Sequence, residues 1–145
     1  MTSVTPDDRE RLRRLLISTL SEVPGFPFAG MHVSLVVAPD GSGGGGVSFD
    51  DGVEERLAPL YTDEQYANCA SWNEEYTGTE EEKSSSLSEM FFLGTLGAVH
   101  KAVAECWPAD RRHLEASISN SILSLTIYIS GHITDPLTCE PIPLT

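Results

Sequence analysis

Basic side chains are scarce in this chain of 145 residues, which has nine lysines and arginines against 22 aspartates and glutamates. The formal net charge is −13 at pH 7, and the isoelectric point is near 4.5. Nucleic acid and anionic membrane surfaces attract proteins through basic residues, so this balance argues against both as partners. It favours a partner protein that carries positive charge.

Cysteine is scarce as well, and its three copies form no metal or redox motif. Cys69, Cys106 and Cys139 are far apart, with no CxxC pair among them. The four histidines are scattered without an HExxH motif, and no acidic cluster has the spacing of a calcium loop. We therefore predict no metal site, no cofactor and no catalytic residue.

Long apolar runs are missing, since the longest is far below the roughly 18 residues that a transmembrane helix needs. The N-terminus has no charged-then-apolar pattern of a signal peptide. Together with the odd number of cysteines, this favours reduced thiols and a cytoplasmic location. We expect one domain, residues 1–145, with its own core.

The longest predicted helix runs from Ser86 to Trp107, with Ser86 and Glu89 as its capping box and Pro108 at its end. Its first two turns are apolar on several sides, so we place it in the centre of the domain, against a sheet. One face recurs at spacings of four and three. That face consists of Phe92, Leu96, Val99, Val103 and Cys106.

A second predicted helix precedes the first strand. Thr5 is its expected N-cap and Pro6 its first residue, and a leucine stripe follows. Residues 31–38 alternate between apolar and polar side chains, which predicts a strand with one wet face. Its predicted partner is the short run from Val47 to Phe49, after a flexible glycine-rich loop at 41–46.

A second hairpin is predicted with Asn120 and Ser121 as a two-residue turn. In this register all the strongly apolar side chains except one share a face. The turn residues and the alternation of apolar side chains therefore indicate the same register independently. The six predicted pairs are Ile118 with Leu123, Ala116 with Leu125, Leu114 with Ile127, Ser119 with Ile122, Ser117 with Ser124, and Glu115 with Thr126. Residues 134–145 carry three prolines, which exclude a central strand and favour an extended tail.

These elements define an α+β fold, with an antiparallel sheet built from two hairpins and packed by the long central helix and the N-terminal amphipathic helix. Between the first hairpin and the long helix lies the acidic segment, residues 50–82, with eleven carboxylates and a single arginine. Thr62 and Gln65 predict a capping box for a short helix that extends to about Tyr76.

The leading functional hypothesis is a non-enzymatic, acidic protein-binding module of the inhibitor, immunity or chaperone type, which engages a basic surface through the acidic segment. Aromatic side chains near the centre of an interface carry much of its binding energy, so they join the carboxylates as candidates. The predicted partner-binding residues are Trp72, Glu74, Glu75, Tyr76, Glu80, Glu81 and Glu82.

Three other interpretations stay open. The acidic segment could be only a solubilising face. The chain could be a homo-oligomeric adaptor or assembly subunit, such as a homodimer, that associates through sheet edges or the central helix. It could also be a small cysteine or histidine enzyme, with Cys106 and His113 meeting across the turn that follows the long helix.

Overall fold

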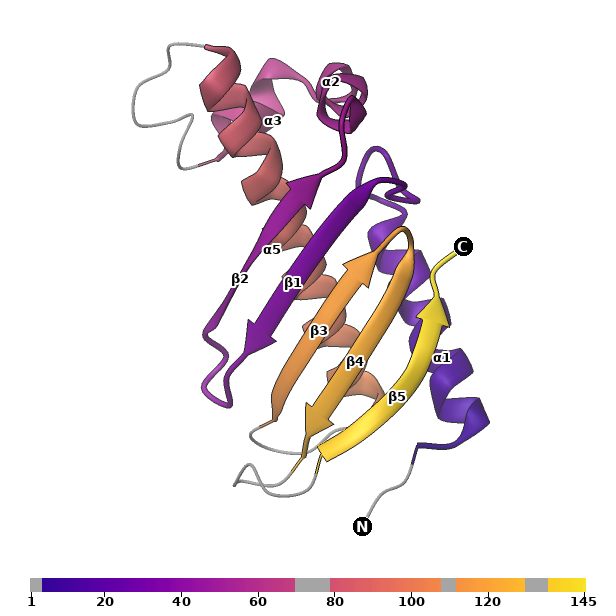
Figure 1. The fold of residues 1–145 in the computed structure, drawn as a ribbon. Coiled ribbons are helices and arrows are strands. Elements are labelled where there is room, and N and C mark those ends of the chain that lie inside the picture. Colours follow the sequence, from indigo (N-terminus) through magenta and orange to yellow (C-terminus); the bar gives the residue numbers. More distant parts are fainter. Residues whose placement is uncertain (1–3, 70–78, 108–111, 130–135) are drawn as a thin grey trace.

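The computed structural model describes residues 4–69, 79–107, 112–129 and 136–145. The described chain forms two layers, a five-stranded antiparallel sheet and a helical layer on one of its faces (Figure 1). This confirms the predicted α+β fold. The elements are α1 (Pro6–Leu20), β1 (Met31–Val37), β2 (Gly43–Phe49), α2 (Val53–Leu57), the 3₁₀ helix η1 (Ala58–Leu60), α3 (Asp63–Ala67), α5 (Glu80–Cys106), β3 (His113–Ser119), β4 (Ile122–Tyr128) and β5 (Pro136–Pro143).

The strand order is β2-β1-β3-β4-β5, so the two predicted hairpins join through β1 and β3. Side chains alternate along each strand, and the inward set is buried beneath α1 and α5. The outward set forms a surface that no described helix covers, which we call the open face. It includes His32, Ser34, Val36, Gly44, Gly46, Ser48, Glu115, Ser117, Ser119, Ile122, Ser124, Thr126, Thr138 and Pro141.

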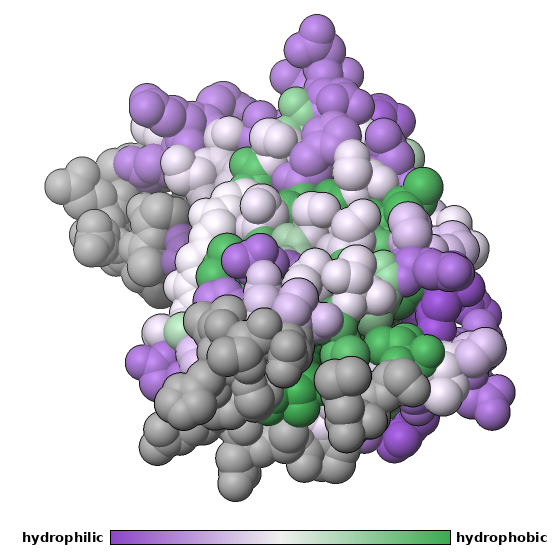
Figure 2. Space-filling view, turned by 60° about the horizontal axis from the view of Figure 1, so that its bottom comes forward, coloured by the Kyte–Doolittle hydropathy of each residue, from purple (hydrophilic) through white to green (hydrophobic). Residues whose placement is uncertain are grey.

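The open face is built mostly from small side chains of near-neutral hydropathy. Figure 2 shows a pale centre, with strongly hydrophilic residues along the upper and right-hand margins. Two shallow hollows of about 510 and 380 Å³ lie on this face, both lined by Ser34 and Ser117. Because serine, threonine and glycine have small side chains or none, they add little cover to the strands on this side of the sheet.

The N-terminal helix forms as predicted. The Thr5 hydroxyl accepts from the backbone N–H of Asp8 at 3.1 Å, and the Asp8 carboxylate accepts from the N–H of Thr5 at 3.2 Å. The leucine stripe is completely buried at Leu12, Leu16 and Leu20. The stripe packs α1 against the long helix and the β5 edge of the sheet.

Helix α5 begins seven residues earlier than predicted, because its N-cap is Thr79 rather than Ser86. The Thr79 hydroxyl accepts from the backbone N–H of Glu82 at 3.2 Å. Three glutamates then occupy the first turn, where their charge is favourable beside the positive end of the helix dipole. Residues 79–85, which precede the predicted helix, supply this cap and the first turns of α5.

The buried face of α5 is rotated from the predicted face. Val99 and Val103 are buried as expected, but Phe92, Leu96 and Cys106 are only partly buried. The largest completely buried side chain of α5 is Phe91, which is 0% exposed. Its ring makes T-shaped contacts with three other rings. These are Phe28 at 5.3 Å, Tyr61 at 5.6 Å and Phe49 at 6.0 Å between centroids.

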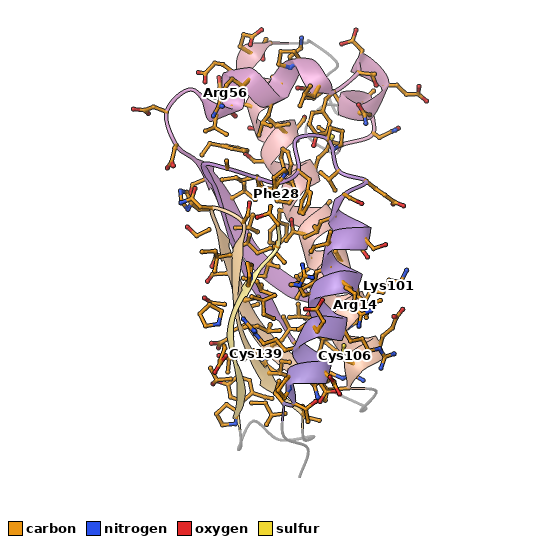
Figure 3. All side chains as sticks on the ribbon, turned by 90° about the vertical axis from the view of Figure 1, so that its right-hand side faces the viewer. Arg14, Phe28, Arg56, Lys101, Cys106 and Cys139 are labelled. Carbon is orange, nitrogen blue, oxygen red and sulfur yellow. The ribbon has the colours of Figure 1, made fainter. Side chains whose placement is uncertain are left out.

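This aromatic cluster lies where several segments meet. Phe28 comes from the loop before β1 and lies between the sheet and the helical layer (Figure 3). Phe49 is the last residue of β2, and Tyr61 follows η1. Tyr61 also donates its hydroxyl to the carbonyl of Pro24 at 3.1 Å. Phe91 therefore holds α5, the sheet and the small helices together.

The second hairpin matches the predicted register at all six pairs. Asn120 and Ser121 have φ values of 49° and 67°, as a type I′ turn requires. The structure adds a contact that the turn pattern does not predict, because the backbone N–H of Gly30 donates to the Asn120 side-chain oxygen at 2.9 Å. The turn therefore also fixes the entry to β1.

The glycine run is not the flexible loop that we predicted, since Gly43 to Gly46 form the first half of β2. Their pairing with β1 is continuous from Val37 with Gly43 to Met31 with Phe49. At Gly45 only glycine fits: its φ is +143°, and a Cβ there would lie 1.8 Å from the Ser34 carbonyl oxygen. Pairing with the apolar strand β1 outweighs the low strand propensity of glycine.

The proline-rich tail is a strand as well. Residues 136–143 form β5, which pairs antiparallel with β4 and has an irregularity between Leu123 and Leu125. Prolines are compatible with this position because an edge strand uses only half of its amides in pairing. Ile142 and Leu144 are completely buried, and the N–H of Leu144 donates to the Ser121 carbonyl at 2.7 Å. Residues 134 and 135 of the predicted tail lie outside the described residues.

Truncating Phe91 tests the aromatic cluster. We expect Phe91→Ala to lower the free energy of unfolding by about 3–5 kcal/mol, because it leaves a cavity beneath three other rings. The matched control is Leu60→Ala, since Leu60 is 51% exposed. The control should cost about 1 kcal/mol or less in urea unfolding. Equal losses in the two variants would contradict the central position of Phe91.

The hairpin turn offers a paired test. The positive φ alone would make glycine neutral at residue 120, but Asn120→Gly also removes the acceptor of the Gly30 N–H, so we expect a loss of about 1–2 kcal/mol. Ser121→Gly relieves a positive φ and should be neutral or stabilise by up to about 1 kcal/mol. Thermal unfolding of both variants measures the difference, and the reverse order would exclude this turn geometry.

Candidate functional site

Acidic residues from three separate stretches of the sequence lie at one end of the molecule, around α2, α3 and the start of α5 (Figure 1). We call this end the acidic cap. Most of its carboxylates are exposed, and its two basic residues are Arg56 and Lys83. The acidic residues of the cap are Asp50, Asp51, Glu54, Glu55, Asp63, Glu64, Glu80, Glu81 and Glu82.

The acidic cap has a local structural cause. Each of the three helices carries its acidic residues in the first turn, at the positive end of its dipole. In α3 the predicted capping box is present, with the Thr62 hydroxyl accepting from the N–H of Gln65 at 3.2 Å. Three helix N-termini at one end of the fold therefore allow a density of negative charge that would otherwise repel itself.

Part of the predicted partner-binding set lies in this cap. Glu80 and Glu81 are exposed and Glu82 is half-buried in the first turn of α5. A small cleft of about 170 Å³ separates this turn from α2. Within it the Ser84 hydroxyl donates to the Glu54 carboxylate. The other predicted members, Trp72, Glu74, Glu75 and Tyr76, lie outside the described residues.

A second constellation, which the sequence analysis did not predict, lies on the open face. His32 of β1 has its Nδ1 atom 2.6 Å from the Ser119 hydroxyl oxygen and its Nε2 atom 2.9 Å from a carboxylate oxygen of Asp50. Ser119 lies directly across from His32 on β3, and Asp50 follows the end of β2. Serine, histidine and aspartate are the residue types of a hydrolase triad.

The surroundings of His32 differ from those of a hydrolase site. In the triad the serine contacts Nε2 and the aspartate holds Nδ1, the reverse of the arrangement here. Ser119 lies in a strand with neighbours on both sides, whereas an oxyanion hole needs free backbone donors beside the nucleophile. The His32 and Asp50 side chains are 35% and 59% exposed, so water competes for both. This geometry fits a structural hydrogen-bond network that links β1, β3 and the end of β2.

The cysteines have the environment of structural rather than reactive thiols. Cys69 and Cys139 are buried and Cys106 is half-buried. Burial raises the pKa of all three thiols above the usual value. Nucleophilic cysteines need the opposite shift, because the thiolate is the reactive form. His113, the base proposed for Cys106, instead packs its ring against Tyr128 at 5.4 Å and lies 3.6 Å from the Glu115 carboxylate.

Among the described residues, no group of three or more histidine, cysteine, aspartate or glutamate side chains is placed to hold a metal ion. No helix within the described ranges is long and apolar enough to cross a membrane. When the chain is compared with protein-family models, with curated proteins and with solved structures, no match is found.

Ser119 can be tested directly as a nucleophile. We expect a fluorophosphonate probe to leave the folded protein unlabelled, because the hydroxyl lacks free backbone donors beside it. Intact-mass measurement of the wild type and of Ser119→Ala gives the readout. Labelling of the wild type that disappears in Ser119→Ala would identify a serine hydrolase and overturn this interpretation.

Proposed function

We propose that the protein is a non-enzymatic binding module of the inhibitor, immunity or chaperone type, which engages a basic surface of another protein through the acidic cap. The observation that carries the proposal is the convergence of acidic residues 50–55, 63–64 and 80–82 at one end of the fold. Sequence separation alone would allow these runs to lie on different sides. Their shared position concentrates the charge on one surface.

Electrostatics gives this surface a long reach. Fields of exposed charges extend over a Debye length of about 10 Å at 0.1 M salt, so a dense acidic surface steers a basic partner before contact. Steering of this kind raises the association rate more than it slows dissociation. Trp72 and Tyr76 remain the proposed aromatic anchors for slow dissociation, because their stretch joins α3 to α5 in the sequence.

Ester hydrolysis is the competing function, and the contacts of His32 with Ser119 and Asp50 are the specific observation in its favour. The two functions use largely different surfaces, because the hydrolytic site would centre on His32 and Ser119 of the open face and the binding site on the acidic cap, with only Asp50 common to both. The fluorophosphonate experiment therefore tests ester hydrolysis and leaves the proposed binding through the acidic cap untouched.

Neutralising exposed charges of the cap tests the proposal. Glu55, Glu64 and Glu81 are exposed, and each lies in the first turn of a different helix. We expect their combined change to glutamine to reduce the association rate with a basic partner by about tenfold, with a weaker salt dependence than the wild type. Partners are isolated on the immobilised wild-type protein from an extract of its own cells, and their binding is then followed by surface plasmon resonance at several salt concentrations.

The matched control removes the same number of charges outside the cap. Asp7, Glu105 and Glu140 are exposed and lie in α1, α5 and β5, respectively. Changing Asp7 to asparagine and the two glutamates to glutamine should leave the association rate within about twofold of the wild type, because α1 begins and α5 ends at the end of the molecule opposite the cap, and β5 is the far edge strand (Figure 1). A partner that binds both triple variants equally fast, or whose binding is indifferent to salt, would refute the acidic cap as the binding surface.

A further inference from the structure

The two edges of the sheet are protected to different degrees. The β5 edge carries Pro136, Pro141 and Pro143, which have no N–H and hinder pairing with another strand. The β2 edge has neither proline nor charge in its sequence GGGGVSF. Among the described residues no strand lies on its outer side (Figure 1). An unprotected edge of seven residues is a template for a further strand.

The pairing of β2 with β1 shows which backbone groups face outward. The N–H of Ala38 donates to the Ser42 carbonyl, and the N–H of Asp50 donates to the Gly30 carbonyl, both at 2.7 Å. In an antiparallel ladder hydrogen-bonded residues alternate with those that face the other way. The backbone N–H and C=O groups of the even-numbered residues of β2 therefore point toward β1 and hydrogen-bond to it. The outward groups are those of Gly43, Gly45, Val47 and Phe49.

Two glycines of this strand are not required by the fold itself. A Cβ at Gly44 or Gly46 would meet no atom within 4 Å, in contrast to Gly45. Glycine in a strand is destabilising by roughly 0.5–1 kcal/mol relative to alanine. Where the chain's own packing does not demand it, glycine is typical of a place where another backbone approaches closely. Both glycines lie on the open face of the outermost strand, next to the free edge.

An uncharged apolar strip of α5 lies beside the edge. A Cβ at Gly43 would be 3.0 Å from a Leu96 methyl, and one at Gly45 would be 3.0 Å from the Phe92 ring, so both side chains lie against β2. Leu93, on the neighbouring outer side of α5, is 54% exposed. No charged residue occurs from Met90 to His100. The strip is a neutral zone in a chain whose net charge is −13.

We propose that the β2 edge and this strip form a homodimer interface, in which a second copy of the chain adds its β2 antiparallel to the first. The neutral zone favours a second copy over a basic partner, because two acidic chains repel each other least where the facing surfaces carry no charge. A basic partner would be drawn to the acidic cap instead. A two-fold contact also requires a self-complementary patch, and a strand edge is one.

The outward groups define the register of this pairing. If Gly46 lies on the two-fold axis, Gly45 pairs with Val47 of the second copy and Gly43 pairs with Phe49, so every outward N–H and C=O finds a partner. The two Gly46 residues then form a close, non-hydrogen-bonded pair, with Cα atoms about 4.5 Å apart. Both α5 helices lie on the same side of a ten-stranded sheet, and the antiparallel arrangement places the acidic caps at opposite ends.

Substitution at the two-fold axis is the direct test. The wild type should sediment as a dimer that dissociates on dilution from near-millimolar to low-micromolar concentration. Gly46→Glu has room in the monomer but opposes two charges in the dimer, so it should raise the dimer Kd by roughly tenfold or more. The matched control, Ser117→Glu, adds the same charge to the open face on the central strand β3 and should remain dimeric.

If circular dichroism shows that Gly46→Glu is unfolded, a second pair of variants tests the same interface. Leu93→Lys should weaken the dimer, whereas Ile122→Lys should not, because Ile122 is similarly exposed at 47% but lies on β4. A wild type that is monomeric throughout the concentration range would overturn the proposal. So would a dimer that is unchanged by every folded variant of the edge and the strip.

Discussion

The burial of α5 against one face of the sheet is the constraint on which the other features depend. Its centre is Phe91, whose ring contacts Phe28, Phe49 and Tyr61 and so joins the loop before β1, the end of β2 and the small helices. With α1 beside it, α5 leaves the opposite face open. The same contact holds the start of α5 beside α2 and α3, which brings three helix N-termini and their carboxylates together.

Local patterns predicted much of this fold. The second hairpin followed from two independent constraints, turn chemistry and alternation, and its register is correct at every predicted pair. The predicted start of α5 was wrong because an N-cap needs only one suitable hydroxyl group, and both Thr79 and Ser86 have one. The glycine run and the proline tail were assigned away from the sheet on propensity, which pairing with β1 and β4 overrides.

The candidate site was only partly predictable. The sequence shows the acidic runs, but their convergence depends on where α5 starts and how the small helices pack on it. The contacts of His32 with Ser119 and Asp50 depend on β1 lying beside β3, and the alternation within each hairpin does not specify how two hairpins join. Likewise, the sequence named sheet edges as possible interfaces without showing that prolines protect one edge and glycines line the other.

The proposed dimer requires that β2 is an ordered strand, with one side paired to β1 and the other side covered by a second copy. Residue-by-residue amide exchange along β2 measures both properties at once. At low concentration, amides of Gly44, Gly46 and Ser48 should be protected by β1, while those of Gly43, Gly45 and Val47 exchange fast. At high concentration all six should be protected. Fast exchange of the outward amides at every concentration, or of all six, would contradict the account.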